Sequence, residues 1–351
     1  MFSKSDVYME DLESIVANKA VDWDKLKDGT VLVTGATGLI GSNIVNALLY
    51  ANKVKNSNIT VVALVRNIDK AVSVFGTPES FDNKLVFVQG TVENLPHIDC
   101  EIDYIIHGAS PTASSFFINN PVETIKTAVW GTDNMLQLAK EKQVKGFVYL
   151  SSMEVYGSPL ADDKLYETAS TTIDTMAVRS CYPEAKRMCE YLCASYSSEY
   201  NVPATVARLS QTFGPGVSKD DNRVFAEFAR CAMNGKDIVL RTKGDSKRTY
   251  IYTADAVSAI LVLMLNGVSG NAYNIANPQT YCSIYEMAKM IADEIATEKI
   301  DIIINATEES MKKYPPAHHL NLQCDKLMAL GWKPEVTLKD MYIRMIKDYK
   351  G

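Results

Sequence analysis

Short apolar runs rich in β-branched residues alternate with helical stretches along the first half of the chain. The runs predict buried strands at 30–34, 59–65, 85–88, 104–107 and 146–150. Helical periodicity lies between them, at 42–49 and about 121–142, and residues 5–27 are typical of a helical extension. Strands that alternate with helices predict an α/β fold with a doubly wound parallel sheet.

The second half changes character and predicts a smaller lobe. We expect helices at 183–200, 224–234 and 338–349 and strands at 204–208 and 238–241. The predicted division is an N-terminal helical extension at 1–27, a dinucleotide-binding domain at 28–209 to which 248–275 returns, and a C-terminal substrate-binding lobe at 210–247 and 276–351.

Composition and charge exclude several classes of protein. The 351 residues are 47% hydrophobic and 22% charged, which excludes a mainly disordered chain. A net charge of −6 argues against binding to nucleic acid. The acidic N-terminus lacks the apolar core of a signal peptide, and the longest apolar stretch, 256–265, is too short to span a membrane.

The spacing of the cysteine and histidine residues does not predict a metal site. The seven cysteines are odd in number and contain no C-x-x-C pair, so we expect reduced thiols and a cytoplasmic location. The adjacent His318 and His319 follow two prolines and are expected in a surface loop, with metal binding as the less favoured interpretation.

A glycine-rich turn follows the first strand. Three glycines spaced by three residues lie between a strand and a helix, where backbone N–H groups can approach a pyrophosphate at the positive end of the helix. The alternative is an ordinary glycine-rich turn. The turn predicts a Rossmann-type cofactor site that comprises Gly35, Thr37, Gly38, Leu39, Ile40 and Gly41.

The end of the second strand bears on the choice of cofactor. An acidic residue there would favour NAD, whereas Arg66 follows Val65 in this chain. Arg66 and the nearby Lys70 favour NADP, or NAD held mainly by other contacts. A solvated arginine without a ligand is the alternative interpretation of Arg66.

A catalytic constellation follows the fifth strand. Tyr182 and Lys186 are four residues apart and share a helix face, so the ammonium could stabilise the phenolate. Ser152, at the strand end, could hold a substrate alcohol against Tyr182. Together they predict proton and hydride transfer at a secondary alcohol.

This combination of motifs resembles the extended short-chain dehydrogenase/reductases, in particular their nucleotide-sugar epimerase, dehydratase and decarboxylase branch. The segments H-G-A-S-P at 107–111, E-V-Y-G at 154–157 and K-R-T-Y-I-Y at 247–252 look closest to UDP-glucuronate decarboxylases (UDP-xylose synthases). The resemblance covers about residues 28–345. It implies NAD as cofactor, with NADP as the alternative, and a nucleotide-diphosphate sugar, most simply a UDP-sugar, as substrate.

The resemblance also implies roles for residues outside the glycine turn. Ala109 and Ser110 would contact the cofactor together with Tyr182 and Lys186. Substrate contacts would come from Ser152, Glu154, Gln211 and Arg248, and Glu154 would act beside C5 of the sugar. The chain departs from the family pattern at Thr91, Ala128, Met153, Gln211 and Gly216.

A transient 4-keto sugar can lead to several products. We expect a UDP-glucuronate decarboxylase-like lyase, because the A-S-P and E-V-Y-G segments and Arg248 resemble that family and a carboxylate at Glu154 suits proton transfer at C5 or steering of the decarboxylation. A nucleotide-hexose 4,6-dehydratase or 4-epimerase, an NADPH-dependent 4-ketosugar reductase and a non-catalytic nucleotide-sugar binder are the alternatives. The helices at about 121–142 and 183–200 resemble the pair that forms this family's dimer interface, which predicts a homodimer.

Overall fold

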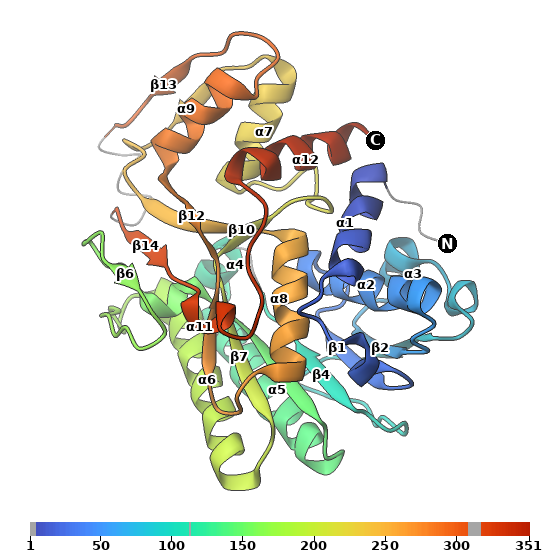
Figure 1. Cartoon of the computed structure of the whole chain (residues 1–351). Helices are drawn as coiled ribbons and strands as arrows, with labels where there is room; N and C mark the ends of the chain where they lie inside the picture. Colours follow the sequence, from blue (N-terminus) through green and yellow to red (C-terminus); the bar gives the residue numbers. More distant parts are fainter. Residues whose placement is uncertain (1–4, 112–113, 308–316) are drawn as a thin grey trace.

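A seven-stranded parallel sheet forms the centre of the larger part of the molecule (Figure 1). The computed structural model describes residues 5–111, 114–307 and 317–351. The strand order is β11-β7-β5-β4-β1-β2-β3, and every neighbouring pair is parallel. The strands are β1 (Thr30–Thr34), β2 (Thr60–Val65), β3 (Leu85–Gln89), β4 (Tyr104–His107), β5 (Gly146–Ser152), β7 (Ala204–Leu209) and β11 (Ala272–Ile275).

Helices cover both faces of this sheet, because alternate strand residues belong to two separate cores. Val31 and Val33 of β1 pack in the core beneath α2 (Leu39–Lys55) and α8 (Thr253–Asn266). Leu32 faces the opposite core, beneath α5 (Pro121–Glu141) and α6 (Cys181–Tyr200). The predicted α/β class with a doubly wound parallel sheet is therefore confirmed.

The N-terminal extension folds as α1 (Asp6–Ala17) and a short 3₁₀ turn (Trp23–Leu26). Helix α1 packs against α2, α8 and α12 (Leu338–Lys350). Buried Asp11 joins these elements, since it accepts hydrogen bonds from Tyr252 Oη at 2.7 Å and from Arg344 Nη2 at 2.7 Å. Burial raises the pKa of Asp11 to about 6.

The smaller lobe is built on a five-stranded mixed sheet above the carboxyl ends of the large sheet (Figure 1). Its strand path is β12-β10-β14-β6, with β8 paired to β10. The strands are β6 (Lys164–Leu165), β8 (Gln211–Phe213), β10 (Lys247–Tyr252), β12 (Asn277–Ser283) and β14 (His319–Leu322). A second pair, β9 (Ile238–Leu240) and β13 (Ile302–Ile304), lies near α7 (Val224–Asn234) and α9 (Ile284–Glu294).

Several short elements complete the described chain. They are α3 (Ile68–Phe75), α4 (Ser114–Asn119), α11 (Asp325–Met328) and 3₁₀ turns at Pro78–Phe81, Met153–Tyr156 and Val178–Ser180. The helix expected at 42–49 begins earlier, at Leu39, and ends later, at Lys55. The prediction of a surface loop at His318 and His319 is wrong for His319, which begins β14 and has a side chain only 20% exposed.

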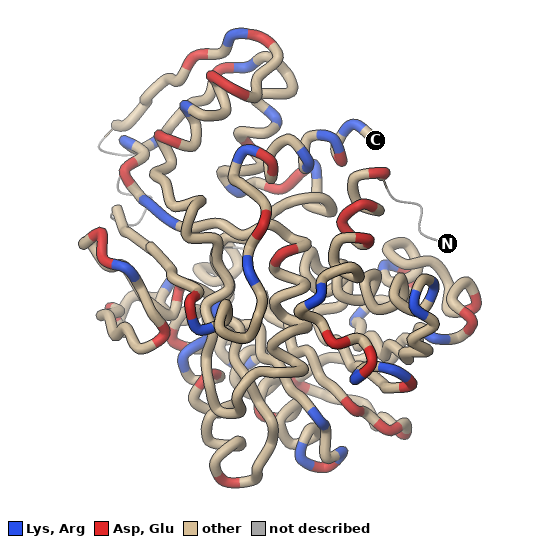
Figure 2. The backbone as a smooth tube through the Cα atoms, viewed as in Figure 1, with Lys and Arg blue, Asp and Glu red and all other residues tan. Residues whose placement is uncertain are grey.

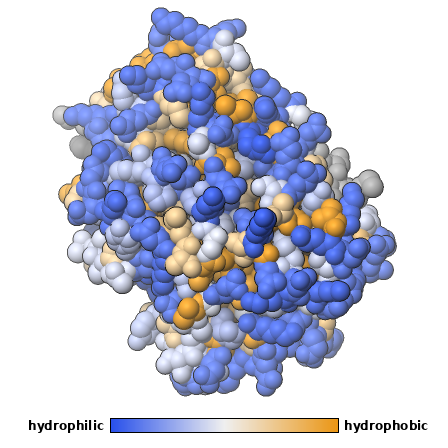
Figure 3. Space-filling view, viewed as in Figure 1, coloured by the Kyte–Doolittle hydropathy of each residue, from blue (hydrophilic) through white to orange (hydrophobic). Residues whose placement is uncertain are grey.

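Residues with charges of both signs are interspersed along the chain (Figure 2). Among the described residues, no helix is long and apolar enough to cross a membrane. The face seen in Figure 3 is mostly hydrophilic, with apolar residues in small patches.

Candidate active site

The strand order places a switch point at the carboxyl end of β1. From β1 the chain builds β2 and β3 on one side and then crosses to β4 on the other. The loops after β1 and β4 consequently diverge, and ligands of open α/β sheets bind in the crevice between such loops.

The glycine turn after β1 leaves no space for a side chain at Gly35 or Gly41. Gly35 has a φ of +68°, and a Cβ there would lie 2.7 Å from the carbonyl carbon of Gly108. A Cβ on Gly41 would overlap the carbonyl oxygen of Gly35. Helix α2 starts directly after its N-cap residue Gly38, which provides no side-chain cap. This cradle fits a pyrophosphate, whose oxygens can accept from the first N–H groups of α2.

A buried threonine and histidine hold the neighbouring loop against this turn. Thr34 Oγ1 lies 2.7 Å from His107 Nδ1 and accepts hydrogen bonds from the backbone N–H groups of Gly108 and Ala109. Burial, and then the charge of Lys186, lower the pKa of His107 to about 3. His107 is therefore neutral and has a structural role.

The other expected cofactor residues lie at the same edge of the sheet. Thr37 in the turn and Leu39 and Ile40 at the start of α2 are half-buried. Arg66 is exposed after β2, beside β1 in the sheet, and Ser110 lies two residues after Gly108, its hydroxyl donating to the Pro111 carbonyl. The structure thus gathers the predicted cofactor residues at the switch point.

The structure brings Ser152, Tyr182 and Lys186 together. Ser152, at the end of β5, is close enough to Tyr182, in the first turn of α6, for its side chain to lower the pKa of the phenol. Lys186 Nζ donates to the Leu150 carbonyl oxygen at 2.7 Å and lies 5.8 Å from the centre of the Tyr182 ring. The spacing of four residues therefore has the predicted consequence that both side chains face β5.

Burial disfavours the ionised forms of both Tyr182 and Lys186. It raises the pKa of Tyr182, and the negative charge of Glu154 adds to this effect, while Ser152 and Arg179 oppose it. It also lowers the pKa of Lys186 to about 8. In the protein alone the pKa of the Tyr182 phenol is raised, so the lowering expected from Lys186 is not seen. A bound nicotinamide would add positive charge near the phenol, and this charge would favour the phenolate.

Glu154 has an arginine partner that sequence reasoning missed. It lies in the 3₁₀ turn after β5, and its two carboxylate oxygens accept from Arg179 Nη1 at 2.8 Å and Nη2 at 3.2 Å. Arg179 stands three residues before Tyr182, in the turn that leads into α6. The pattern R-x-x-Y could have indicated that Arg179 lies near Tyr182. The sequence gives no indication that Arg179 pairs with Glu154.

Aromatic stacking encloses the phenol. Phe117 of α4 stacks on the Tyr182 ring with centroids 4.2 Å apart and an interplanar angle of 12°. The Arg179 guanidinium lies 5.8 Å from the centre of the Phe117 ring. Phe117 thus connects the arginine to the tyrosine and keeps that side of the phenol dry.

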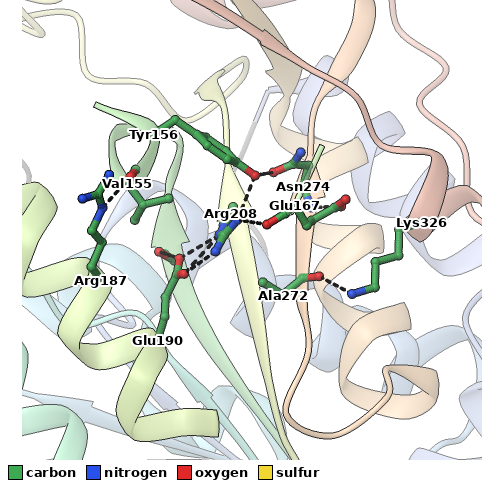
Figure 4. Close-up of polar contacts among 10 residues, drawn as sticks. Val155, Tyr156, Glu167, Arg187, Glu190, Arg208, Ala272, Asn274 and Lys326 are labelled. Atoms are coloured by element: carbon green, nitrogen blue, oxygen red, sulfur yellow. Dashed lines mark hydrogen bonds and ion pairs between the residues drawn. The ribbon is translucent and has the colours of Figure 1, made fainter. Parts of the chain in front are cut away.

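A polar network joins the elements that carry Ser152, Tyr182 and Lys186 (Figure 4). Glu190, one helical turn after Lys186, accepts from Ser151 Oγ at 2.6 Å and from Arg208 Nη2 at 2.7 Å. Arg208 also donates to Tyr156 Oη at 2.9 Å, and Tyr156 donates to Asn274 Oδ1 at 2.8 Å. The network joins β5, α6, β7 and β11, and it agrees with a structural role for Tyr156.

The expected substrate residues of the smaller lobe lie on neighbouring strands. Gln211 starts β8 and pairs with Tyr250 of β10. Arg248 Nη2 lies 3.3 Å from His318 Nε2, and no acceptor among the described residues contacts the buried Nε of Arg248. An oxygen-rich ligand would satisfy this donor. Among the described residues, no group of His, Cys, Asp and Glu could hold a metal ion.

The sequence matches the family described as the NAD dependent epimerase/dehydratase family over residues 31–276. The chain belongs to this family. It is an NAD-dependent enzyme, and the match confirms both the family resemblance and the nicotinamide cofactor expected from the glycine turn.

Individual relatives agree with this assignment. The chain is 30% identical over 324 residues to UDP-glucuronic acid decarboxylase 6 of Arabidopsis thaliana, with 91% of this chain and 88% of that protein covered. It is 32% identical over 323 residues to UDP-glucuronic acid decarboxylase 4 of the same plant, with 91% of this chain and 68% of that protein covered.

Solved structures share the fold. A dTDP-glucose 4,6-dehydratase from Bacillus anthracis, crystallised with NAD, has a TM-score of 0.74 at 22% identity and covers 92% of this chain and 96% of its own. The epimerase Mth375 from Methanothermobacter thermautotrophicus has a TM-score of 0.76 at 23% identity and covers 94% and 95%.

Proposed function

We propose that this NAD-dependent enzyme removes CO2 from a nucleotide-linked uronic acid, with UDP-glucuronate as the substrate to be tested first. The observation that carries the proposal is the two-pronged Glu154–Arg179 pair, whose charges act on the Tyr182 phenol, with the Ser152 side chain also close enough to lower the pKa of that phenol. The similarity to UDP-glucuronic acid decarboxylases over 91% of the chain supports the choice of substrate.

The chain's own residues would act as follows. Ser152 would hold the C4 hydroxyl of the sugar, and Tyr182 would take its proton, while the Lys186 ammonium favours the phenolate. When bound, the nicotinamide accepts a hydride from C4 and later returns it. A ketone at C4 is β to the carboxylate on C5, so the C5–carboxylate bond can break with its electrons delocalised into the ketone. Glu154 would move a proton at C5, and Arg248 would bind the diphosphate.

The test is an incubation with UDP-glucuronate and NAD, followed by mass spectrometry. We expect a product that has lost CO2, with no net consumption of NAD. An unchanged substrate at high enzyme concentration would overturn the proposal. Three further arms then separate the alternatives: loss of water from a nucleotide hexose, with solvent deuterium at C5, indicates a dehydratase, a C4-inverted UDP-hexose an epimerase, and net loss of NADPH with a 4-keto sugar a reductase.

We also infer a homodimer formed through α5 and α6. These helices pack on each other, yet their outer faces carry large apolar side chains: Trp130 is 55% exposed and Tyr191 71%. Val122, Ile125 and Met188 add to this surface. Exposed apolar residues gathered on one helix pair favour a protein interface over contact with water.

A cytoplasmic location is part of the proposal. All seven cysteines are free, and Cys189, Cys193 and Cys324 are buried. Unpaired thiols are typical of a reducing compartment.

A further inference from the structure

We propose that Arg179 recognises the C6 carboxylate of the sugar and so makes the site selective for uronic acids over neutral hexoses. This inference rests on the proposed function, because it assumes a nucleotide sugar whose C4 hydroxyl meets Tyr182.

The first support is position. Arg179 precedes Tyr182 by three residues, and its guanidinium lies 5.8 Å from the ring of Phe117, which is itself stacked on Tyr182. Its positive charge acts on the phenol, whose pKa it lowers. In a hexose, C6 is attached to C5, which adjoins C4. A C4 hydroxyl held by Ser152 and Tyr182 therefore places the C6 substituent in the neighbourhood of this guanidinium.

The second support is chemistry. The guanidinium already holds a carboxylate in the two-pronged arrangement that arginine favours, with Glu154 at 2.8 and 3.2 Å. A guanidinium has five N–H donors, and Glu154 engages one on each Nη nitrogen. The side chains of Arg179 and Glu154 are 36% and 30% exposed, so a ligand can reach the pair. A second carboxylate can share the guanidinium with Glu154 or displace it, whereas a neutral hydroxymethyl group gains much less.

Because Glu154 and the sugar carboxylate would compete for Arg179, removing Arg179 and removing the Glu154 charge should change the affinity for the acidic sugar in opposite directions. Removing Arg179 should weaken binding of the acidic sugar, and removing the Glu154 charge should strengthen it because the guanidinium then loses its internal partner. A neutral hexose should respond little to either change. Since this contact exists before any bond is broken, it should act on substrate affinity more than on the rate of the chemical step.

The experiment measures binding by calorimetry to the NAD-loaded protein. UDP-glucuronate and UDP-glucose serve as probes because they differ only at C6. Loss of a charge-assisted hydrogen-bonded contact corresponds to about a 10- to 100-fold weaker affinity. We expect that loss for UDP-glucuronate in Arg179→Gln, a smaller loss in Arg179→Lys, which keeps the charge, and a gain in Glu154→Gln. UDP-glucose affinity should stay within about threefold in all three variants.

The matched control is Arg223→Gln, which removes an arginine that pairs with Asp221 through its Nη2 at 2.6 Å and lies in the smaller lobe before α7. It should leave both affinities unchanged. Equal losses for both sugars in Arg179→Gln would overturn the inference and assign Arg179 to positioning of Glu154 or Tyr182, and unchanged affinities would overturn it as well.

Failure of the proposed function gives a different result: the wild-type protein would bind neither UDP-sugar, or would bind UDP-glucuronate without releasing CO2. Circular dichroism and a thermal melt show whether Arg179→Gln folds. If it does not, the other two variants test the inference, because the affinity for UDP-glucuronate should fall in Arg179→Lys and rise in Glu154→Gln.

Discussion

Tyr182 and Lys186 occupy a dry site in which each ionised form costs free energy. Burial raises the pKa of the phenol and lowers that of the ammonium. Sites of this kind give up stability for reactivity, because the charge that the reaction needs is the one the fold disfavours. Two predictions belong to these residues.

Tyr182→Phe should remove the proton acceptor and leave the fold intact. Phenylalanine keeps the ring that stacks on Phe117, and Ser152 Oγ keeps its contact with the backbone N–H of Glu154 at 3.2 Å. We expect product formation to fall by about 10²- to 10⁴-fold, the usual contribution of a general acid or base. Thermal melting should stay close to that of the wild type, and retained turnover would exclude Tyr182 as the proton acceptor.

Lys186→Met should stabilise the fold in a pH-dependent manner. The pKa of Lys186 falls from 10.5 to about 8, so below pH 8 the folded chain must hold a buried ammonium, at a cost of up to about 3 kcal/mol. Between pH 8 and pH 10.5 the unfolded chain binds more protons than the folded one, and the cost disappears as the pH rises.

Urea unfolding at several pH values checks this second prediction. At pH 7 the variant should have the larger free energy of unfolding. Loss of the hydrogen bond from Lys186 to Leu150 reduces this gain. That advantage should shrink as the pH approaches 10. A stability difference that does not change with pH would contradict it.

Residues such as Ser152 and Tyr182 could be predicted because a strand end and a helix spacing fix their positions. Arg179 could not. It reaches Glu154 through the course of the chain between Gly157 and Ser180, where two-residue β6 is the only strand that the structure describes. Neither periodicity nor turn chemistry determines the path of such a segment.

At the scale of elements, the network around Glu190 and Arg208 connects α6 to the ends of β5 and β7 (Figure 4). Glu190→Gln should leave the Arg208 guanidinium, whose side chain is only 14% exposed, without its charged partner. We expect the free energy of unfolding to fall by about 3–5 kcal/mol, the usual cost of breaking a buried ion pair from one side.

An exposed pair provides the control for this prediction. Lys339 and Glu294 are 2.9 Å apart with side chains 45% and 49% exposed, so Lys339→Gln should change the free energy of unfolding by less than about 1 kcal/mol. Equal effects of the two substitutions in chemical denaturation would show that the Glu190 network does not hold the elements together.

The elements of the large sheet could be predicted because continuous β-branched runs are typical of strands buried on both faces. The smaller lobe was harder. Its sheet combines β12 and β14 with the two-residue β6, and pairing between strands so distant along the chain leaves no periodic signal. The domain boundaries drawn from the sequence stay a prediction.

At the scale of the whole molecule, the proposed dimer would form through the outer faces of α5 and α6. Tyr191→Glu combined with Trp130→Glu should convert the inferred dimer to a monomer, because buried like charges would face each other across a two-fold interface. Sedimentation velocity provides the measurement. Val239→Glu is the control, since Val239 is 42% exposed on β9 of the smaller lobe. A wild-type protein that sediments only as a monomer would refute the dimer.

The exposure of Trp130 also makes the chain report on its own assembly. Of the three tryptophans, Trp23 and Trp332 are buried at 6% and 1% exposure, while Trp130 is 55% exposed. A soluble quencher such as acrylamide can therefore reach the indole of Trp130 in an isolated subunit and has little access to the other two. Dilution through the dissociation range should consequently unmask one fluorophore, and unlabelled protein is sufficient to follow it.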